Sequence, residues 1–442
     1  MRFEDWTILT PAERFREAEW SRGRLREFGP RLNAVVAFAA SAATSAGDVS
    51  GPLAGLPYVS KDMLDRAGRP SHWGGVRPSG AQPQVTAEVL KRLDEAGAVE
   101  VAVAAMTELA YEPSGYNAAR GRALNPWHPD AVTGGSSSGS AALVACGAAV
   151  LGIGSDTGGS VRIPASCCGI TGLKPTGGAP SDPAVMPLAP SLDTVGFMAR
   201  GAAELAFVLP IVLPGARSSE PFGRAAILAD CLAEATPGVR DAVRSGIEAL
   251  RQTGVDVRSV EIADVLANAD EDALSVMQAE SARFHAGRPF EEGRLSATLL
   301  RRLAKGIEIG DDVLAGCLGR RENLVSAFSE RLGGADLAVL PVMPIETPLA
   351  AETDPASPSF RPRVLYAMSR FTRFVNLLGL PALSVPCGFD ARGVPVGLQM
   401  IGPAGSEARL LATAARLQSA TDWHGRCPPF LSGSPQQASA SR

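Results

Sequence analysis

Two segments rich in serine and glycine lie close together in the chain, and a lysine precedes both of them. Residues 133–140 read TGGSSSGS, residues 154–160 read GSDTGGS, and Lys61 follows the largely apolar residues 55–60. Serine becomes a good nucleophile only when a base removes its proton, and neighbouring glycines let backbone N–H groups approach a developing oxyanion. These residue types therefore predict a hydrolase that works through a covalent intermediate.

Lys61 is unusual because arginine supplies most of the positive charge in this chain. Of the 42 basic residues, lysines are found only at positions 61, 91, 174 and 305. Arginine cannot lose its proton in a protein, whereas a buried lysine can become a neutral base. Lys61 is therefore a candidate base if it is buried. The alternative is a lysine whose charged end reaches solvent or pairs with Asp62.

Two other motif interpretations of the first segment fit less well. Residues 135–139 match GxSxG, which would make Ser137 the nucleophile of an α/β-hydrolase with His285 or His424 as its base, but the preceding residues are not a strand. The same glycines have the spacing of a phosphate-binding loop, but Ser140 stands where such a loop needs lysine. The covalent hydrolase remains the better interpretation.

Composition indicates a globular enzyme that acts on small molecules. The chain has 442 residues, 45% of them hydrophobic, and a net charge of −4. No basic block favours nucleic acid or an anionic membrane as a partner. The seven cysteines are scattered and the four histidines lack the HExxH spacing, so we expect reduced thiols and no metal site. The N-terminus has no apolar signal region, and we expect a cytoplasmic protein without a membrane span.

Hydrophobic periodicity and capping residues predict alternating helices and strands. We expect helices at 11–28, 85–93, 140–150, 237–253 and 407–418, strands at 99–103, 225–229, 255–260 and 338–340, and a hairpin of 382–387 with 394–401. Residues 272–332 are mainly helical and charged, as a layer covering an active site would be. The polar tail 432–442 is expected to be disordered.

Taken together, these motifs are similar to those of the amidase signature family. The resemblance rests on residues 134–140, 154–166 and 172–176, on NLLGLP at 376–381, and on PVGLQMI at 395–401. It extends from about residue 51 to residue 429. It implies an α/β fold, a three-layer α/β/α sandwich with a large mixed central sheet covered by helices. The resemblance also implies a single domain over residues 1–431, with 272–332 as its least characteristic segment.

The resemblance also implies the roles of the site residues. Ser160 would be the nucleophile, Ser136 a bridging serine in a cis peptide, and Lys61 the base. The oxyanion hole would consist of backbone N–H groups of Thr157, Gly158, Gly159 and Ser160. Asp156 and Arg162 flank the nucleophile closely, and we expect them to pair and hold its loop. No metal or other cofactor is expected.

The predicted activity is hydrolysis of a small-molecule carboxamide to a carboxylate and ammonia or an amine, through an acyl-enzyme on Ser160. The alternatives are a ureido-type amide hydrolase, acting on biuret- or allophanate-like substrates, and the glutamine-hydrolysing subunit of a tRNA-dependent amidotransferase. That branch of the family has an acidic residue shortly before the NLxGLP motif, where this chain has residues 369–373. Whether a partner subunit is required, or a homo-oligomer forms, stays open.

Several further residues have two interpretations. Arg361, Arg363, Arg370 and Arg373 would favour a carboxylated or ureido substrate, or they are solvated surface arginines. His72 and Trp73, shortly after Lys61, would line the substrate pocket or pack in the core. Glu112 occupies a position where the family often has glycine.

Overall fold

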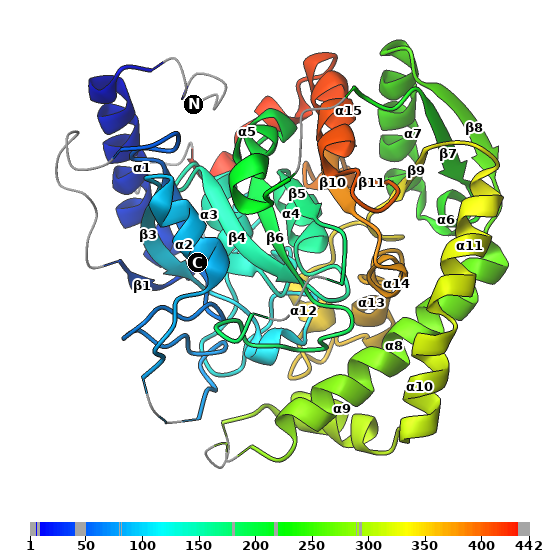
Figure 1. The fold of residues 1–442 in the computed structure, drawn as a ribbon, viewed down its shortest axis with the longest axis horizontal. Coiled ribbons are helices and arrows are strands. Elements are labelled where there is room, and N and C mark those ends of the chain that lie inside the picture. The colour runs from blue at the N-terminus through cyan, green and yellow to red at the C-terminus, as the bar shows by residue number, and fades with distance from the viewer. Residues whose placement is uncertain are drawn as a thin grey trace.

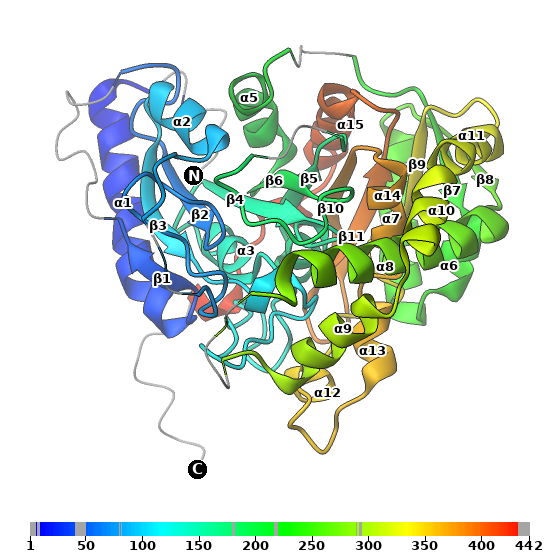
Figure 2. The same cartoon turned by 60° about the horizontal axis from the view of Figure 1, so that its bottom comes forward.

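The computed structural model describes residues 6, 9–39, 50–78, 80, 82–178, 182–215, 220–288, 290 and 294–431. Within these residues, eleven strands form one mixed sheet in the order β1-β3-β2-β4-β6-β5-β10-β11-β9-β7-β8, and helices cover both of its faces (Figures 1 and 2). The predicted α/β fold with a large mixed sheet is therefore confirmed. The predicted disorder of 432–442 falls outside the described residues, and the single domain stays a prediction.

The strands are β1 (Val35–Phe38), β2 (Pro57–Lys61), β3 (Val99–Ala104), β4 (Leu151–Asp156), β5 (Thr171–Lys174), β6 (Thr194–Ala199), β7 (Arg224–Leu228), β8 (Asp256–Val260), β9 (Leu337–Pro341), β10 (Ala382–Phe389) and β11 (Pro395–Ile401). The longer helices are α1 (Pro11–Arg31), α2 (Glu88–Glu95), α3 (Ser138–Ala145), α5 (Ala202–Val212), α7 (Pro237–Gln252), α8 (Ala263–His285), α9 (Ala297–Ile307), α10 (Asp311–Gly319), α11 (Arg321–Leu332) and α15 (Glu407–Ser419). Shorter helices include α4 (Arg162–Cys168), α12 (Ala350–Thr353), α13 (Pro362–Ala367) and α14 (Arg373–Leu378).

Parallel pairing of β2 with β4 brings Lys61 and the second serine segment to the same end of two neighbouring strands. Ser60 of β2 lies beside Ile153 of β4. Because parallel neighbours run in the same direction, their carboxyl ends lie at the same edge. Lys61 is the last residue of β2 and Asp156 the last of β4. The lysine and the start of the second serine segment therefore meet although they are far apart in the sequence.

Strand β11 contacts helices on both faces of the sheet. Its side chains alternate between the two faces of the sheet. Leu398 and Met400 pack into the hydrophobic cluster that contains residues of α7 and α15. Gly397 lies against Ser166 of α4, where an added Cβ would be 2.6 Å from the hydroxyl oxygen, and Gln399 contacts the same helix by hydrogen bonding to Arg162. The strand thus supplies both core packing and a polar contact to the site.

The expected helix at 140–150 differs most from the structure. Helix α3 covers Ser138–Ala145 and is followed by β4 from Leu151. Gly147 has a φ of 67°, which a right-handed helix cannot accommodate. Gly152 then faces the side chains of α3, where an added Cβ would be 3.0 Å from Val144. Small residues on both sides of Gly147 let β4 pack closely against α3. The same run of small apolar residues led to the prediction of one long helix.

Candidate active site

Lys61 is fully buried and contacts two serine hydroxyls. Its side chain has no solvent exposure. The Nζ atom lies 2.7 Å from Ser136 Oγ and 2.8 Å from Ser155 Oγ, both hydrogen-bond distances. The alternative in which the charged end of Lys61 reaches solvent or pairs with Asp62 is therefore wrong for this structure. Sequence reasoning did not assign a role to Ser155, although that residue lies within the second predicted motif.

Burial changes the protonation of Lys61. Removal from water disfavours the ammonium form and lowers the pKa of Lys61 to about 7, although Asp156 and Asp193 act in the opposite direction. Lys174 is equally buried, and burial lowers its pKa to about 7 as well. However, Lys174 Nζ donates to the carbonyl oxygen of Pro175 at 2.7 Å. Contact with serine hydroxyls, rather than burial, distinguishes Lys61.

The first serine segment approaches the site through a cis peptide bond. The bond joins Gly135 to Ser136, as the resemblance implied, and the Ser136 side chain is buried. The N–H of Gly135 donates to Pro113 O at 2.6 Å, and the N–H of Ser137 donates to Ser160 O at 3.2 Å. The two serine segments therefore touch through their backbones. Ser160 is 9% exposed, whereas Ser136 has no exposure.

The loop that carries Pro113 is organised by Glu112. The Glu112 carboxylate accepts the N–H groups of Ser114, Gly115 and Tyr116, each at 3.0 Å. Burial raises the pKa of Glu112, although these hydrogen bonds oppose the shift. The residue that replaces a frequent glycine of the family thus orders the backbone that lies against the cis peptide.

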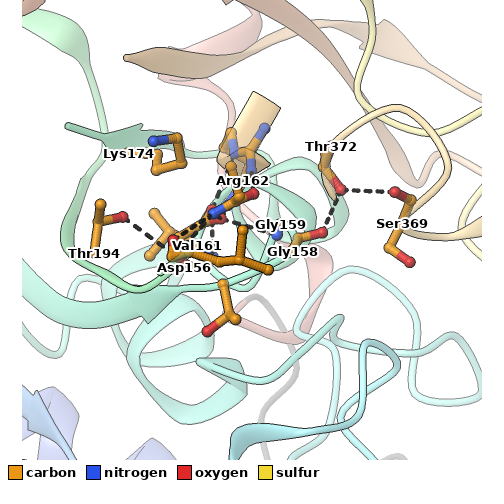
Figure 3. Close-up of polar contacts among 12 residues, drawn as sticks. Asp156, Gly158, Gly159, Val161, Arg162, Lys174, Thr194, Ser369 and Thr372 are labelled. Carbon is orange, nitrogen blue, oxygen red and sulfur yellow. Dashed lines mark hydrogen bonds and ion pairs between the residues drawn. The ribbon is translucent and has the colours of Figure 1, made fainter. Parts of the chain in front are cut away.

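Asp156 holds the loop that leads to Ser160. Its carboxylate accepts the N–H groups of Gly159 at 2.8 Å and of Val161 at 3.1 Å. It also pairs with Arg162, whose Nη2 lies 2.8 Å from Oδ1 and whose Nε lies 3.0 Å from Oδ2. Figure 3 shows these contacts converging on one carboxylate. The expected pairing of Asp156 with Arg162 is therefore present. One of the four predicted oxyanion donors, the N–H of Gly159, donates to Asp156.

The Asp156–Arg162 pair is completely buried, with no exposure of either side chain. Burial alone would raise the pKa of Asp156, but the Arg162 guanidinium and the hydrogen bonds to the carboxylate hold it well below its usual range. The carboxylate is therefore ionised near neutral pH.

Partners of this ion pair come from far along the chain, and sequence reasoning missed them. Arg162 Nη1 donates to Gln399 Oε1 at 2.6 Å, and Nη2 donates to Asn376 Oδ1 at 2.6 Å. Asn376 Nδ2 in turn donates to Asp156 Oδ1 at 2.9 Å. Asn376 lies in the motif at 376–381 and Gln399 in the motif at 395–401. The motifs therefore singled out both residues, but they did not predict that the two amides bind Arg162.

The four arginines that suggested an anionic substrate have partners or face solvent. Arg370 and Arg373 both bind the Asp270 carboxylate of α8, at 2.7 Å and 2.8 Å. Arg361 pairs with Glu352 at 3.2 Å, and Arg363 is exposed. Their charges are therefore largely satisfied without a ligand.

His72 and Trp73 lie in different surroundings. His72 is half-exposed, and its Nδ1 lies 2.9 Å from Asp62 Oδ1, a hydrogen bond that raises the pKa of His72. Trp73 is buried in the large hydrophobic cluster and meets the His285 ring edge-on at 6.1 Å. The core interpretation holds for Trp73.

The described residues contain neither a cluster suited to a metal ion nor a helix suited to a membrane. Across the described ranges, no three His, Cys, Asp or Glu side chains come together in a way that could hold a metal ion. Of the helices in that part of the chain, none is both long and apolar enough to cross a bilayer.

Replacement of Asp156 by asparagine tests how much the buried pair contributes to stability. Asp156→Asn leaves the Arg162 charge buried without a counter-charge, so the free energy of unfolding should fall by about 3–5 kcal/mol. Asp422→Asn is the matched control, because Asp422 forms a solvent-exposed pair with Arg426 and should change stability by less than about 1 kcal/mol. Urea unfolding followed by circular dichroism measures both. Equal effects of the two substitutions would contradict the importance assigned to Asp156.

Comparison with known proteins agrees with this geometry. The family model described as Amidase matches residues 24–411. A glutamyl-tRNA(Gln) amidotransferase subunit of Deinococcus radiodurans is 33% identical, over 88% of this chain and 90% of that protein. A solved structure described as an amidase has a TM-score of 0.82 at 29% identity and covers 93% of this chain and 96% of its own. The corresponding amidotransferase subunit of Thermotoga maritima has a TM-score of 0.79 at 26% identity, with coverage of 95% and 94%. The chain therefore belongs to the amidase family, whose members are enzymes that act on C–N bonds.

Proposed function

We propose that this protein hydrolyses a small-molecule carboxamide through an acyl-enzyme on Ser160. The observation that carries the proposal is the fully buried Lys61 Nζ within hydrogen-bond distance of Ser136 Oγ and Ser155 Oγ. A neutral amine at this place can accept a proton from a hydroxyl. Ser160 is the better candidate nucleophile than Ser136 or Ser155, because it is the most exposed of the three and its carbonyl oxygen accepts the N–H of Ser137, the residue next to Ser136.

In the proposed first half-reaction, Ser160 Oγ attacks the amide carbonyl carbon. As the C–O bond forms, the proton of Ser160 passes to Ser136, and the proton of Ser136 passes to Lys61 Nζ. Negative charge develops on the carbonyl oxygen and would be stabilised by the predicted oxyanion donors, the backbone N–H groups of Thr157, Gly158 and Ser160; the fourth, that of Gly159, donates to Asp156 in this structure. When the C–N bond breaks, the proton on Lys61 returns through Ser136 to the leaving nitrogen, which departs as ammonia or an amine.

In the second half-reaction, water takes the place of the leaving amine. Its proton follows the same route to Lys61 while its oxygen attacks the acyl carbon. Collapse of the intermediate breaks the bond to Ser160 Oγ, which recovers a proton through Ser136, and the product acid leaves as a carboxylate after releasing its remaining proton to water. The enzyme is regenerated without any cofactor in the proton transfers.

The proposed nucleophile can be tested by labelling with a fluorophosphonate and locating the label by mass spectrometry. We expect label on Ser160, and we expect Ser160→Ala to lose the label and to lower kcat by roughly a thousandfold or more, because covalent catalysis is removed. Label on Ser137 would instead support the GxSxG interpretation. Full activity of Ser160→Ala would exclude the proposal.

The proposed base predicts a pH dependence. Lys61 accepts a proton only when neutral, and its pKa is about 7. The value of kcat/KM should therefore rise with pH through about 7 and level off above it, with a slope of about one below the pKa in a logarithmic plot. Lys61→Arg should be inactive at every pH because arginine stays protonated. A rate that falls as pH rises through 7 would contradict a lysine base.

A second candidate function is glutamine hydrolysis as one component of an amidotransferase, which the names of similar relatives favour. Against it, the stretch 369–373 before the NLLGLP motif carries no acidic residue, and Arg370 and Arg373 bind Asp270 there.

Ammonia release by the purified chain from a panel of amides separates the two functions. The panel should contain glutamine together with aryl, aliphatic and ureido amides. We expect turnover of at least one non-glutamine amide by the chain alone. Turnover of glutamine only, and only after a partner protein is added, would favour the second candidate.

A further inference from the structure

One peptide unit next to the proposed nucleophile is held at both of its ends. The Thr372 hydroxyl donates to the carbonyl oxygen of Gly158 at 2.6 Å, and the N–H of Gly159 donates to Asp156 Oδ1 at 2.8 Å. These two groups belong to the same planar peptide, so fixing both sets its orientation. The next residue is Ser160. Figure 3 shows Thr372 and Asp156 on opposite sides of this peptide.

The two anchors are themselves connected. The carbonyl oxygen of Phe371, the neighbour of Thr372, accepts a hydrogen bond from Gln399 Nε2 at 2.7 Å. Gln399 Oε1 accepts from Arg162, and Arg162 pairs with Asp156. The two ends of the Gly158–Gly159 peptide are therefore connected by a continuous series of hydrogen bonds, in which the only covalent link is the backbone between Phe371 and Thr372. Thr372, Gln399, Arg162 and Asp156 are all without solvent exposure, and buried networks of this kind are rigid when every member is bonded.

Steric contact reinforces the hydrogen bond. Gly159 has a φ of 123°, a conformation that residues with a side chain rarely adopt, and a Cβ added there would overlap the Thr372 hydroxyl. An added Cβ at Gly158 would lie 3.4 Å from the Cβ of Arg373. The segment at 372–373 thus lies directly against the nucleophile loop.

We propose that Thr372 is a positioning residue for the amide hydrolysis proposed above. Its hydroxyl fixes the Gly158 carbonyl, which sets the direction of the adjacent N–H groups and the place of Ser160 relative to the carbonyl under attack. The inference rests on the proposed function but concerns a side chain that touches neither substrate nor the proton route. Misalignment of groups that act only in the transition state lowers kcat more than it raises KM.

The test compares Thr372→Val with Thr372→Ser. Valine keeps the shape of threonine but removes the donor and places a methyl group against the Gly158 carbonyl. We expect kcat of Thr372→Val to fall roughly 10- to 100-fold with KM within about twofold, since one neutral hydrogen bond and the alignment of the oxyanion donors are affected. Thr372→Ser keeps the hydroxyl and should retain kcat within about threefold.

Thr413→Val is the matched control for a lost buried hydroxyl. Thr413 lies on α15, is also without exposure, donates to Arg409 O at 2.8 Å and accepts the N–H of Phe222 at 2.8 Å. This variant should lose thermal stability while its kcat stays unchanged. The inference is overturned if Thr372→Val keeps wild-type kcat, or if Thr372→Ser is as slow as Thr372→Val.

The rate of fluorophosphonate labelling separates this inference from the proposed function. Absence of label on Ser160 in the wild-type protein would refute the proposed nucleophile. Labelling of Ser160 at equal rates in wild type and Thr372→Val would leave that nucleophile in place and refute the role of Thr372. Slower labelling of Thr372→Val alone is the result we expect.

Discussion

The buried ion pair of Asp156 and Arg162 is the interaction on which the geometry of the loop leading to Ser160, the proposed nucleophile, depends. Moving two charges out of water costs several kcal/mol for each, and the cost is offset only when the remaining donors and acceptors are bonded. Here Asp156 accepts backbone N–H groups from Gly159 and Val161, while Asn376 and Gln399 accept from the guanidinium. An ionised carboxylate inside the protein therefore organises the backbone on both sides of Ser160, and the pair does more than cancel two charges.

The two buried lysines show that a lowered pKa does not by itself identify a base. Lys61 and Lys174 are equally buried, and burial brings both pKa values to about 7. Lys174 contacts a carbonyl oxygen, which has no proton to give, whereas Lys61 contacts two hydroxyls, which do. The chemistry follows from the neighbouring atoms, and burial only makes that chemistry possible near neutral pH.

Local signals in the sequence predicted the elements that depend on local physics. The helix predicted from residue 11 begins there as α1, and the structure shows a full capping box at its start, between Thr10 and Glu13. Residue type and apolar surroundings made Lys61 a candidate base only on the condition that it is buried, and its role beside Ser136 came from the resemblance. Gln399 and Thr372 could not be predicted in the same way. Gln399 meets Arg162 across 237 positions, and Thr372 meets Gly158 across 214. No local periodicity encodes a contact of that range, which only the completed sheet brings about.

These long separations have a consequence for how the enzyme becomes active. Strand β11 and the segment around Thr372 belong to the last quarter of the chain, yet they support a loop that is synthesised far earlier. A ribosome-bound intermediate that has already formed β2 and β4 would hold Lys61 and the serines without the side chains that orient them. An unfinished chain that ends before Thr372 would therefore lack the hydrogen bonds that orient the Gly158–Gly159 peptide.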